Sequence, residues 1–205
     1  MKRSGKGRFR QYLFVIRELT GRELKRKYSR SKLGVVWSIL NPLLNMIVLS
    51  MIFSTMFKRS IENFPVYYLC GSVLWGLFTT STQTAMTSLV DNRQMLIKVK
   101  IPMQVFVISR VYTAFVNFIY SLIAFVPILL VFHIRLNETL LILPFIVLCE
   151  LLFAMGISYA LSVGYVFFGD IRHLYGILLT LWMYLSAIFY PVNSLPEVMI
   201  TEVAN

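Results

Sequence analysis

Five long apolar segments dominate this 205-residue chain, and the basic residues between them fall on alternate sides. The segments cover residues 35–57, 66–90, 103–132, 139–168 and 174–192. A hydrocarbon core of roughly 30 Å is crossed by about 20 apolar residues in a helix, so each segment is long enough to span a bilayer. Hydrophobic residues make up 58% of the chain, which favours an integral membrane protein over a soluble domain. We therefore predict an all-α membrane protein with five transmembrane helices.

The formal charge of +11 is concentrated at residues 1–32, which hold twelve lysines and arginines against two glutamates. If this segment is cytoplasmic, seventeen basic residues lie on the inner side of the membrane and three on the outer side. This asymmetry follows the positive-inside rule. We predict a basic cytoplasmic or interfacial segment at 1–32 and a transmembrane domain at 33–205, in the cytoplasmic membrane with the N-terminus inside. Beside a span, anionic lipid is a better partner for basic residues than nucleic acid.

Part of the basic segment, residues 10–28, has the pattern of an amphipathic helix that lies on the inner leaflet. The alternative is a basic anchor that serves only topology. Two basic residues, Arg17 and Lys27, interrupt the apolar face of the predicted helix. Near the apolar face fall Leu13, Ile16, Thr20, Leu24 and Tyr28, and near the polar face Glu18, Arg22, Lys25 and Arg26.

The cytoplasmic loop between the second and third segments mixes charged with apolar residues. Pro102 ends this loop and marks the start of the next helix. A plain connector has no need of apolar residues among its charges, whereas an amphipathic element that docks onto a soluble partner does. The residues alone leave both readings open. The residues in question are Asp91, Asn92, Arg93, Gln94, Met95 and Leu96, followed by Ile97.

The fourth segment carries a stripe of small residues and one acid. Gly156, Ala160 and Gly164 stand four residues apart, a spacing that lets membrane helices approach closely. Glu150 lies in the same segment, where a charge at the bilayer centre costs roughly 2.5–3.5 kcal/mol on insertion scales. We interpret Glu150 as a structural hydrogen-bonding residue, and ion coupling is the alternative.

Aromatic residues recur every seven positions in the fifth segment, at Tyr175, Trp182 and Phe189, and therefore share one face of a helix. One reading is a core or lipid-facing stripe. The other is a wall of rings against which sugar rings slide. Trp37, near the start of the first segment, suits the membrane interface.

The sequence holds no motif for nucleotide binding or for hydrolytic chemistry. It has no G-x-x-x-x-G-K-[ST] to cradle phosphates, no H-E-x-x-H and no G-x-S-x-G. His133 and His173 fall on opposite sides of the predicted bilayer, so no paired acid and base is evident. We predict that the chain is not an enzyme and binds no cofactor or metal of its own.

Short motifs in a fixed order run through nearly the whole chain. In this order they resemble the type-2 ABC exporter permeases, the membrane subunits that export O-antigen, capsule-like polysaccharide or teichoic acid. Each motif alone is weak, and the resemblance depends on the complete series. The motifs are Arg-Glu-Leu (17–19), Lys-x-x-Tyr (25–28), Ser-x-Leu-Gly-x-x-Trp (31–37), Asn-Pro (41–42), Pro-x-Tyr-Tyr-Leu-x-Gly (65–71), Leu-Ile-Lys-x-x-Ile-Pro (96–102), Asp-Ile-Arg-His (170–173), Ile-Phe-Tyr-Pro (188–191) and Leu-Pro-Glu (195–197).

The resemblance implies a homodimer of permeases, each bound to a separately encoded ATPase subunit that holds ATP and Mg²⁺. The substrate would be a glycan or polyol-phosphate chain on an undecaprenyl carrier. Residues 91–96 would form the coupling helix inserted into the ATPase. The interfacial helix would also contact the ATPase, with Arg17, Arg22, Lys25, Arg26 and Tyr28 as its motif or polar-face residues, and the channel would be lined by Trp37, Tyr175, Trp182 and Phe189.

The sequence departs from the family pattern at two places. Gly169 stands where the family usually has Arg, which weakens any role for a charge pair there. The family has six spans, and at Asn205 it continues into a last helix, so we expect that helix to be missing here. The alternative functions are a type-2 permease for a lipid or drug, an ion-coupled carrier that uses Glu150, and a membrane-bound lipid or sugar transferase.

Overall fold

The computed structural model describes residues 5–29, 34, 36–37, 40–41, 43–45, 47–48, 51, 64–99, 101–131 and 141–186. The described part of the chain is helical and holds no strand, which confirms the predicted all-α class. The described residues from 36 to 51, in the first apolar segment, are helical as well. The helices are α1 (Gly5–Tyr28), α3 (Phe64–Met86), α4 (Ser88–Asp91), α5 (Arg93–Lys98), α6 (Gln104–Val131), α7 (Leu143–Phe167) and α8 (Ile171–Leu185).

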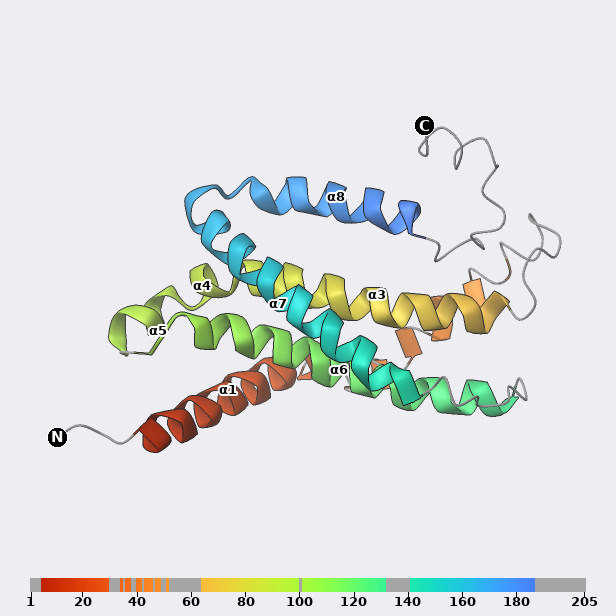
Figure 1. Ribbon diagram of the computed structural model, residues 1–205, viewed down its shortest axis with the longest axis horizontal. Helices are drawn as coiled ribbons and strands as arrows, with labels where there is room; N and C mark the ends of the chain where they lie inside the picture. Colours follow the sequence, from red (N-terminus) through yellow and green to blue (C-terminus); the bar gives the residue numbers. More distant parts are fainter. Residues whose placement is uncertain are drawn as a thin grey trace.

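Helix α3 is central in the described bundle. It packs along α6 and α7, while α8 contacts α3 and α7, and α1 lies against α6 (Figure 1). The short helices α4 and α5, the turn between α7 and α8, and the start of α1 all lie at one end of the bundle (Figure 1). These are the segments that the charge pattern assigns to a single side of the membrane.

The chain between α3 and α6 folds into two short helices. Helix α3 ends at Met86, and Thr87 separates it from α4. The span predicted at 66–90 is therefore wrong at its C-terminal end. Asn92 separates α4 from α5, and its side-chain amide donates to the carbonyl of Ser88 at 2.8 Å. Val99 is extended, and α6 begins two residues after Pro102, because proline suits a helix start but not its interior.

The backbone conformation at Gly34 explains why this motif position is a glycine. Its φ of 46° lies in the left-handed region, which an L side chain rarely adopts. The residue stands between α1 and the first apolar segment, and its carbonyl accepts from the backbone N–H of Trp37 at 3.3 Å. The chain therefore changes direction here at a position that favours glycine.

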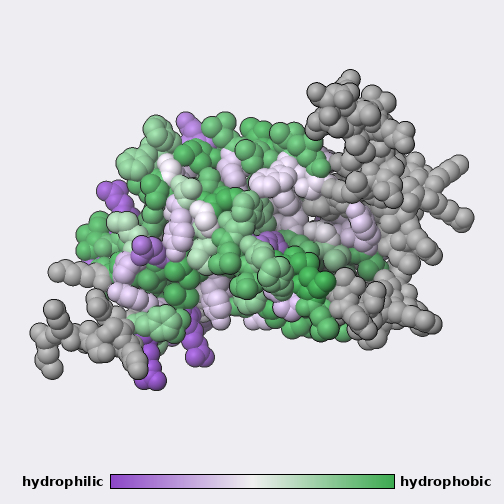
Figure 2. Space-filling model, in the orientation of Figure 1, coloured by the Kyte–Doolittle hydropathy of each residue, from purple (hydrophilic) through white to green (hydrophobic). Residues whose placement is uncertain are grey.

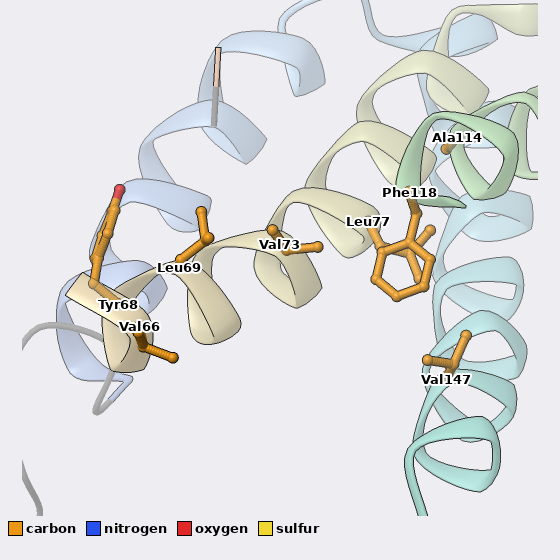
Figure 3. Packing of buried hydrophobic residues seen from close by; sticks show 8 residues of the cluster. All are labelled: Val66, Tyr68, Leu69, Val73, Leu77, Ala114, Phe118 and Val147. Carbon is orange, nitrogen blue, oxygen red and sulfur yellow. The ribbon is translucent and has the colours of Figure 1, made fainter. Parts of the chain in front are cut away.

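Three apolar clusters hold the described helices together. One joins α3, α6 and α7, and in Figure 3 the ring of Phe118 lies beside Leu77 of α3, with Val147 of α7 close by. A second cluster packs Leu19 of α1 against α6 and the end of α3. The third lies between α3, α7 and α8. Lipid tails are as apolar as these side chains, so inside a bilayer close van der Waals packing, rather than removal from water, stabilises the contacts between the helices.

The C-terminal half of α3 is rich in hydroxyl side chains that bond to their own helix. Thr79 donates to the carbonyl of Trp75 at 2.9 Å, Thr82 to Phe78 at 2.9 Å, and Thr84 to Thr80 at 2.6 Å. A polar group needs such a partner when it leaves water. These bonds let a threonine-rich helix pack inside an apolar bundle.

Two described helices are long and apolar enough to cross a membrane by length and composition, at Gln104–Ile123 and Leu143–Phe167. On the face drawn in Figure 2, hydrophobic residues cover much of the described surface, and most of the strongly hydrophilic ones gather towards the end with α4 and α5. The count of five spans stays a prediction.

The small residues that α7 uses for packing differ in part from the predicted ones, of which Gly164 alone is closely packed, with Cδ1 of Ile171 2.9 Å from the position of an added Cβ. Gly156 has no atom within 4 Å of the position of an added Cβ, and Ala160 is exposed. The buried small residues are Ala154, Ser158 and Ser162, four apart on a neighbouring face. The four-residue spacing was correct, but the stripe that faces the bundle begins two residues earlier.

Candidate functional site

The helices α4 and α5 present a small surface at one end of the bundle. Within the segment 91–96 that resembles a coupling helix, Arg93 and Gln94 are exposed. Met95 and Leu96, however, are half-buried and pack against the cluster that contains Leu19. Of the exposed apolar residues in and beside α4 and α5, Ile97 is the most accessible, at 76%, against 46% for Val90, 47% for Val99 and 63% for Met103. A soluble partner would therefore meet Ile97 rather than Met95 or Leu96.

Helix α1 is longer than the predicted helix at 10–28, because it begins at Gly5. Its buried face contains Leu19 and Thr20. Leu13, which the sequence places near the apolar face, is 50% exposed from the bundle, and its contact with the inner leaflet stays a prediction. Arg22, Lys25 and Arg26 are exposed, as predicted for the polar face. Arg17, which interrupts the predicted apolar face, is exposed as well, and the side chain of Tyr28 lies outside the described residues.

Arg110 joins α1, α4 and α6 through one guanidinium group. Its Nη1 donates to Oε1 of Glu23 in α1, and its Nη2 donates to Oδ2 of Asp91 at 3.0 Å. The hydroxyl of Thr87 also donates to Oδ2 of Asp91, at 2.9 Å. The side chains of Arg110, Glu23 and Asp91 are 18%, 24% and 47% exposed, so this ion triad is partly shielded from water.

Neutral hydrogen bonds on both sides of the ion triad hold α1 against its neighbours. The hydroxyl of Thr20 donates to the carbonyl of Ser109 at 3.3 Å, and the hydroxyl of Thr113 donates to that of Thr20 at 3.2 Å. Further contacts continue along α1. Arg22 donates to Oδ1 of Asn92 at 3.1 Å, and Lys27 donates to Oδ1 of Asn117 at 3.2 Å.

The arrangement ties α1 to the short helices at the end of the bundle. Glu23 and Asp91 come from different elements, and a single side chain of α6 contacts both. A rigid displacement of α4 would therefore stretch bonds to α6 and α1 together. Such a network can transmit a mechanical change between elements, since both ends depend on the same group.

A cavity of about 770 Å³, here called the basic cavity, opens beside the ion triad. A second cavity of about 410 Å³ shares four lining residues with it, namely Lys27, Thr80, Ala114 and Asn117. Among the described residues, no three His, Cys, Asp or Glu side chains come together in a way that could hold a metal ion. The lining of the basic cavity comprises Leu19, Arg22, Glu23, Arg26, Lys27, Thr80, Thr84, Asp91, Asn92, Ser109, Arg110, Thr113, Ala114 and Asn117.

The aromatic residues predicted to line a channel lie in different surroundings. Trp182 is 37% exposed and contacts an aromatic group, with ring centroids 5.4 Å from Phe78, 6.0 Å from Trp75 and 6.4 Å from Phe153. Tyr175, seven residues before Trp182, is buried where α8 packs against α3 and α7. Trp37 is exposed, and Phe189 lies outside the described residues. Their role in lining a channel stays a prediction.

Sequence reasoning missed Arg110, which was counted only as a cytoplasmic loop charge. It lies inside α6, seven residues after Met103, in a stretch that is otherwise apolar. A charge inside an apolar helix is costly and usually has a partner or a function. That rule could have singled out Arg110, but its partner Glu23 is 87 residues away in the chain.

Comparison with known proteins places this geometry in a family. Residues 15–203 match the family described as "ABC-2 type transporter". The chain belongs to this family. The match covers α1 from residue 15 onward and all the helices from α3 to α8, so the predicted type-2 ABC exporter permease is confirmed. Membership also makes the chain an integral membrane protein and a transporter subunit, which accords with the expectation that it is not itself an enzyme.

Relatives of this ABC-2 family member carry a more specific name. This chain is 34% identical over 191 residues to the "O-antigen export system permease protein RfbA" of Myxococcus xanthus, and the alignment covers 91% of this chain and 72% of that protein. It is 28% identical over 188 and over 192 residues to two proteins of the same name from Klebsiella pneumoniae, covering 91% of this chain and 73% of each.

Proposed function

We propose that this chain is the transmembrane permease of an ABC exporter for O-antigen polysaccharide. The similarity to proteins named for O-antigen export, over 91% of the chain, carries this proposal. The glycan is attached to an undecaprenyl carrier, and a separate ATPase subunit binds ATP and Mg²⁺ and drives its passage outward. The permease acts as a homodimer in the cytoplasmic membrane, with its N-terminus in the cytoplasm.

The ATPase docks onto the end formed by α4 and α5. The support is local: an exposed apolar residue, Ile97, projects among exposed charged and amide side chains on a short helix. Isolated apolar residues on a charged surface suit a protein interface, because their burial supplies affinity while the polar rim supplies orientation. The ion triad then connects this surface to α1 and α6.

The docking is tested by copurification of the permease with the ATPase from the same transport system. Ile97→Asp should abolish the complex while leaving the yield of folded permease unchanged, since Ile97 has little contact with the bundle. Ile97→Leu is the matched control and should keep the complex. Met95→Asp should instead lower the yield, because Met95 packs against the apolar cluster. If Ile97→Asp still forms the complete complex, the ATPase does not dock on this surface.

The cargo is tested in cells that lack the native permease. Expression of this chain with its ATPase should restore surface O-antigen on an immunoblot, and Ile97→Asp should not. If surface glycan stays absent while a lipid or a drug is exported, the alternative of a lipid or drug permease replaces the polysaccharide. Cross-linking of single-cysteine variants would test the homodimer separately.

A further inference from the structure

The lining of the basic cavity has an excess of positive charge. It contains four cationic side chains and two carboxylates, and its volume of about 770 Å³ falls within the range of small-molecule sites. Both carboxylates, Glu23 and Asp91, are already bound by Arg110. The other cations of the lining are Arg22, Arg26 and Lys27.

These cations lie on the face of α1 that borders the cavity, beside the buried Leu19. Positions 19, 22, 23, 26 and 27 follow the spacing of a single helix face, and all five line the cavity. Four of them carry a charge. Arg22 donates to an amide oxygen of Asn92. In the part of the chain that the structure describes, the guanidinium of Arg26 makes no hydrogen bond or ion pair.

The shape of the space beyond these cations indicates a ligand with an extended part. The second cavity continues from the basic cavity and shares Lys27 and Asn117 with it. Its lining mixes apolar side chains, such as Leu77 and Phe118, with the amides of Asn41 and Asn45. An anion held at α1 could therefore extend an attached chain or sugar along α3 and α6.

We propose that the basic cavity binds the phosphate or diphosphate head group of a lipid. Arg26 and Arg22 provide the charged contacts, because guanidinium groups pair with two phosphate oxygens at once. The inference rests on the proposed function for the orientation of the chain, which sets the cavity at the level of the inner-leaflet phosphates. Two lipids carry this chemistry, the carrier of the exported glycan and an anionic phospholipid of the leaflet.

The test measures binding of a fluorescent analogue of farnesyl diphosphate to the full chain in phosphatidylcholine nanodiscs, without the ATPase. Arg26→Gln should weaken binding about tenfold, the usual effect of losing one charged hydrogen bond. Arg10→Gln is the matched control, because Arg10 is exposed on roughly the opposite face of α1 and does not line the cavity. It should change the dissociation constant less than about twofold, since only screened surface charge is lost.

Competition distinguishes the sources of the phosphate. Displacement by unlabelled farnesyl diphosphate but not by phosphatidylglycerol assigns the site to the carrier, and equal displacement by phosphatidylglycerol assigns it to a phospholipid. Inorganic pyrophosphate that competes as well as farnesyl diphosphate would overturn the lipid part of the proposal. Equal losses in Arg26→Gln and Arg10→Gln, or no saturable binding, would overturn the site itself.

Failure of this site and failure of the proposed function give different results. The binding assay needs neither ATPase nor export, so an absent site with intact O-antigen export leaves the permease function standing. Specific binding by a chain that forms no complex with the ATPase would keep the site and reject the exporter.

Discussion

Removal of the Arg110 charge tests whether the ion triad holds α1 in place. In Arg110→Gln, Glu23 and Asp91 lose their shared cation and are left as neighbouring like charges. Two limits bound the cost: exposed ion pairs contribute roughly 0.2–1 kcal/mol, and removal of one partner from a buried pair costs about 3–5 kcal/mol. The exposures of the three side chains decide where this network lies between them.

Asp91 is 47% exposed, so its bond to Arg110 is screened and contributes about 0.5 kcal/mol. Glu23 and Arg110 are 24% and 18% exposed, so their pair lies between the surface and buried limits, at about 1.5 kcal/mol. Opening of α1 from α6 breaks only the Glu23–Arg110 pair, because Asp91 lies in α4 and not in α1. The loss of about 1.5 kcal/mol corresponds to a roughly twelvefold change in an equilibrium constant, so local opening of α1 should become more frequent by that factor.

Hydrogen–deuterium exchange of the purified chain measures this opening directly. Backbone amides near Thr20 in α1 should exchange roughly twelvefold faster in Arg110→Gln, while amides of α7 keep their rates, because local opening exposes only the detached element. Arg10→Gln is the control on the exposed face of the same helix, and its exchange should match the unaltered chain. The double variant Glu23→Gln/Arg110→Gln should lose less stability than the sum of the single variants, by about 1 kcal/mol.

An unchanged exchange rate of α1 in Arg110→Gln would refute the reasoning, provided that Thr20→Val still raises it. That combination would mean that the neutral bonds and Leu19 hold α1 and that the ions contribute nothing measurable. Additive effects in the double variant would show that the Glu23–Arg110 contact is not energetically coupled.

Three further predictions concern the helices of the transmembrane domain. Ser158→Leu should lower the thermal unfolding temperature in detergent, because overpacking of a fully buried position costs about 1–3 kcal/mol, whereas Gly156→Leu should leave it nearly unchanged because space is open there. Trp182→Ala should destabilise the chain by about 2 kcal/mol in the same assay, and Trp182→Phe should recover much of the loss by keeping a ring against Phe78. Glu150→Gln should leave O-antigen export within about twofold of normal, and its abolition would favour an ion-coupled carrier.

The helical class and the positions of most helices follow from the sequence itself. Apolar runs longer than about 18 residues leave few alternatives to helices, because only helices and closed barrels satisfy the backbone inside a bilayer. The predicted third segment, 103–132, differs from α6 (Gln104–Val131) by one residue at each end. The family also followed from the motif order, since it depends on local residues and not on packing.

The faces that the helices present to one another were predictable only in part. The four-residue spacing of small residues in α7 was predicted correctly, but packing against α3 buries Ala154, Ser158 and Ser162. Of the predicted stripe, Gly164 packs closely, against Ile171 of α8. In the same way, Met95 and Leu96 face the bundle while Ile97 remains exposed. Periodicity defines the faces of a helix, but the positions of neighbouring helices decide which face is buried.

By itself, the sequence determined the helical membrane class, the concentration of basic residues near the N-terminus and the family, because hydropathy, charge and short motifs are properties of contiguous residues. Only the tertiary structure decided that Arg110 binds Glu23 and Asp91 and that a cavity lined by cations lies beside them. The physical reason is that Glu23 and Arg110 are separated by 87 residues, and the packing of α1 on α6 alone brings the two charges into contact.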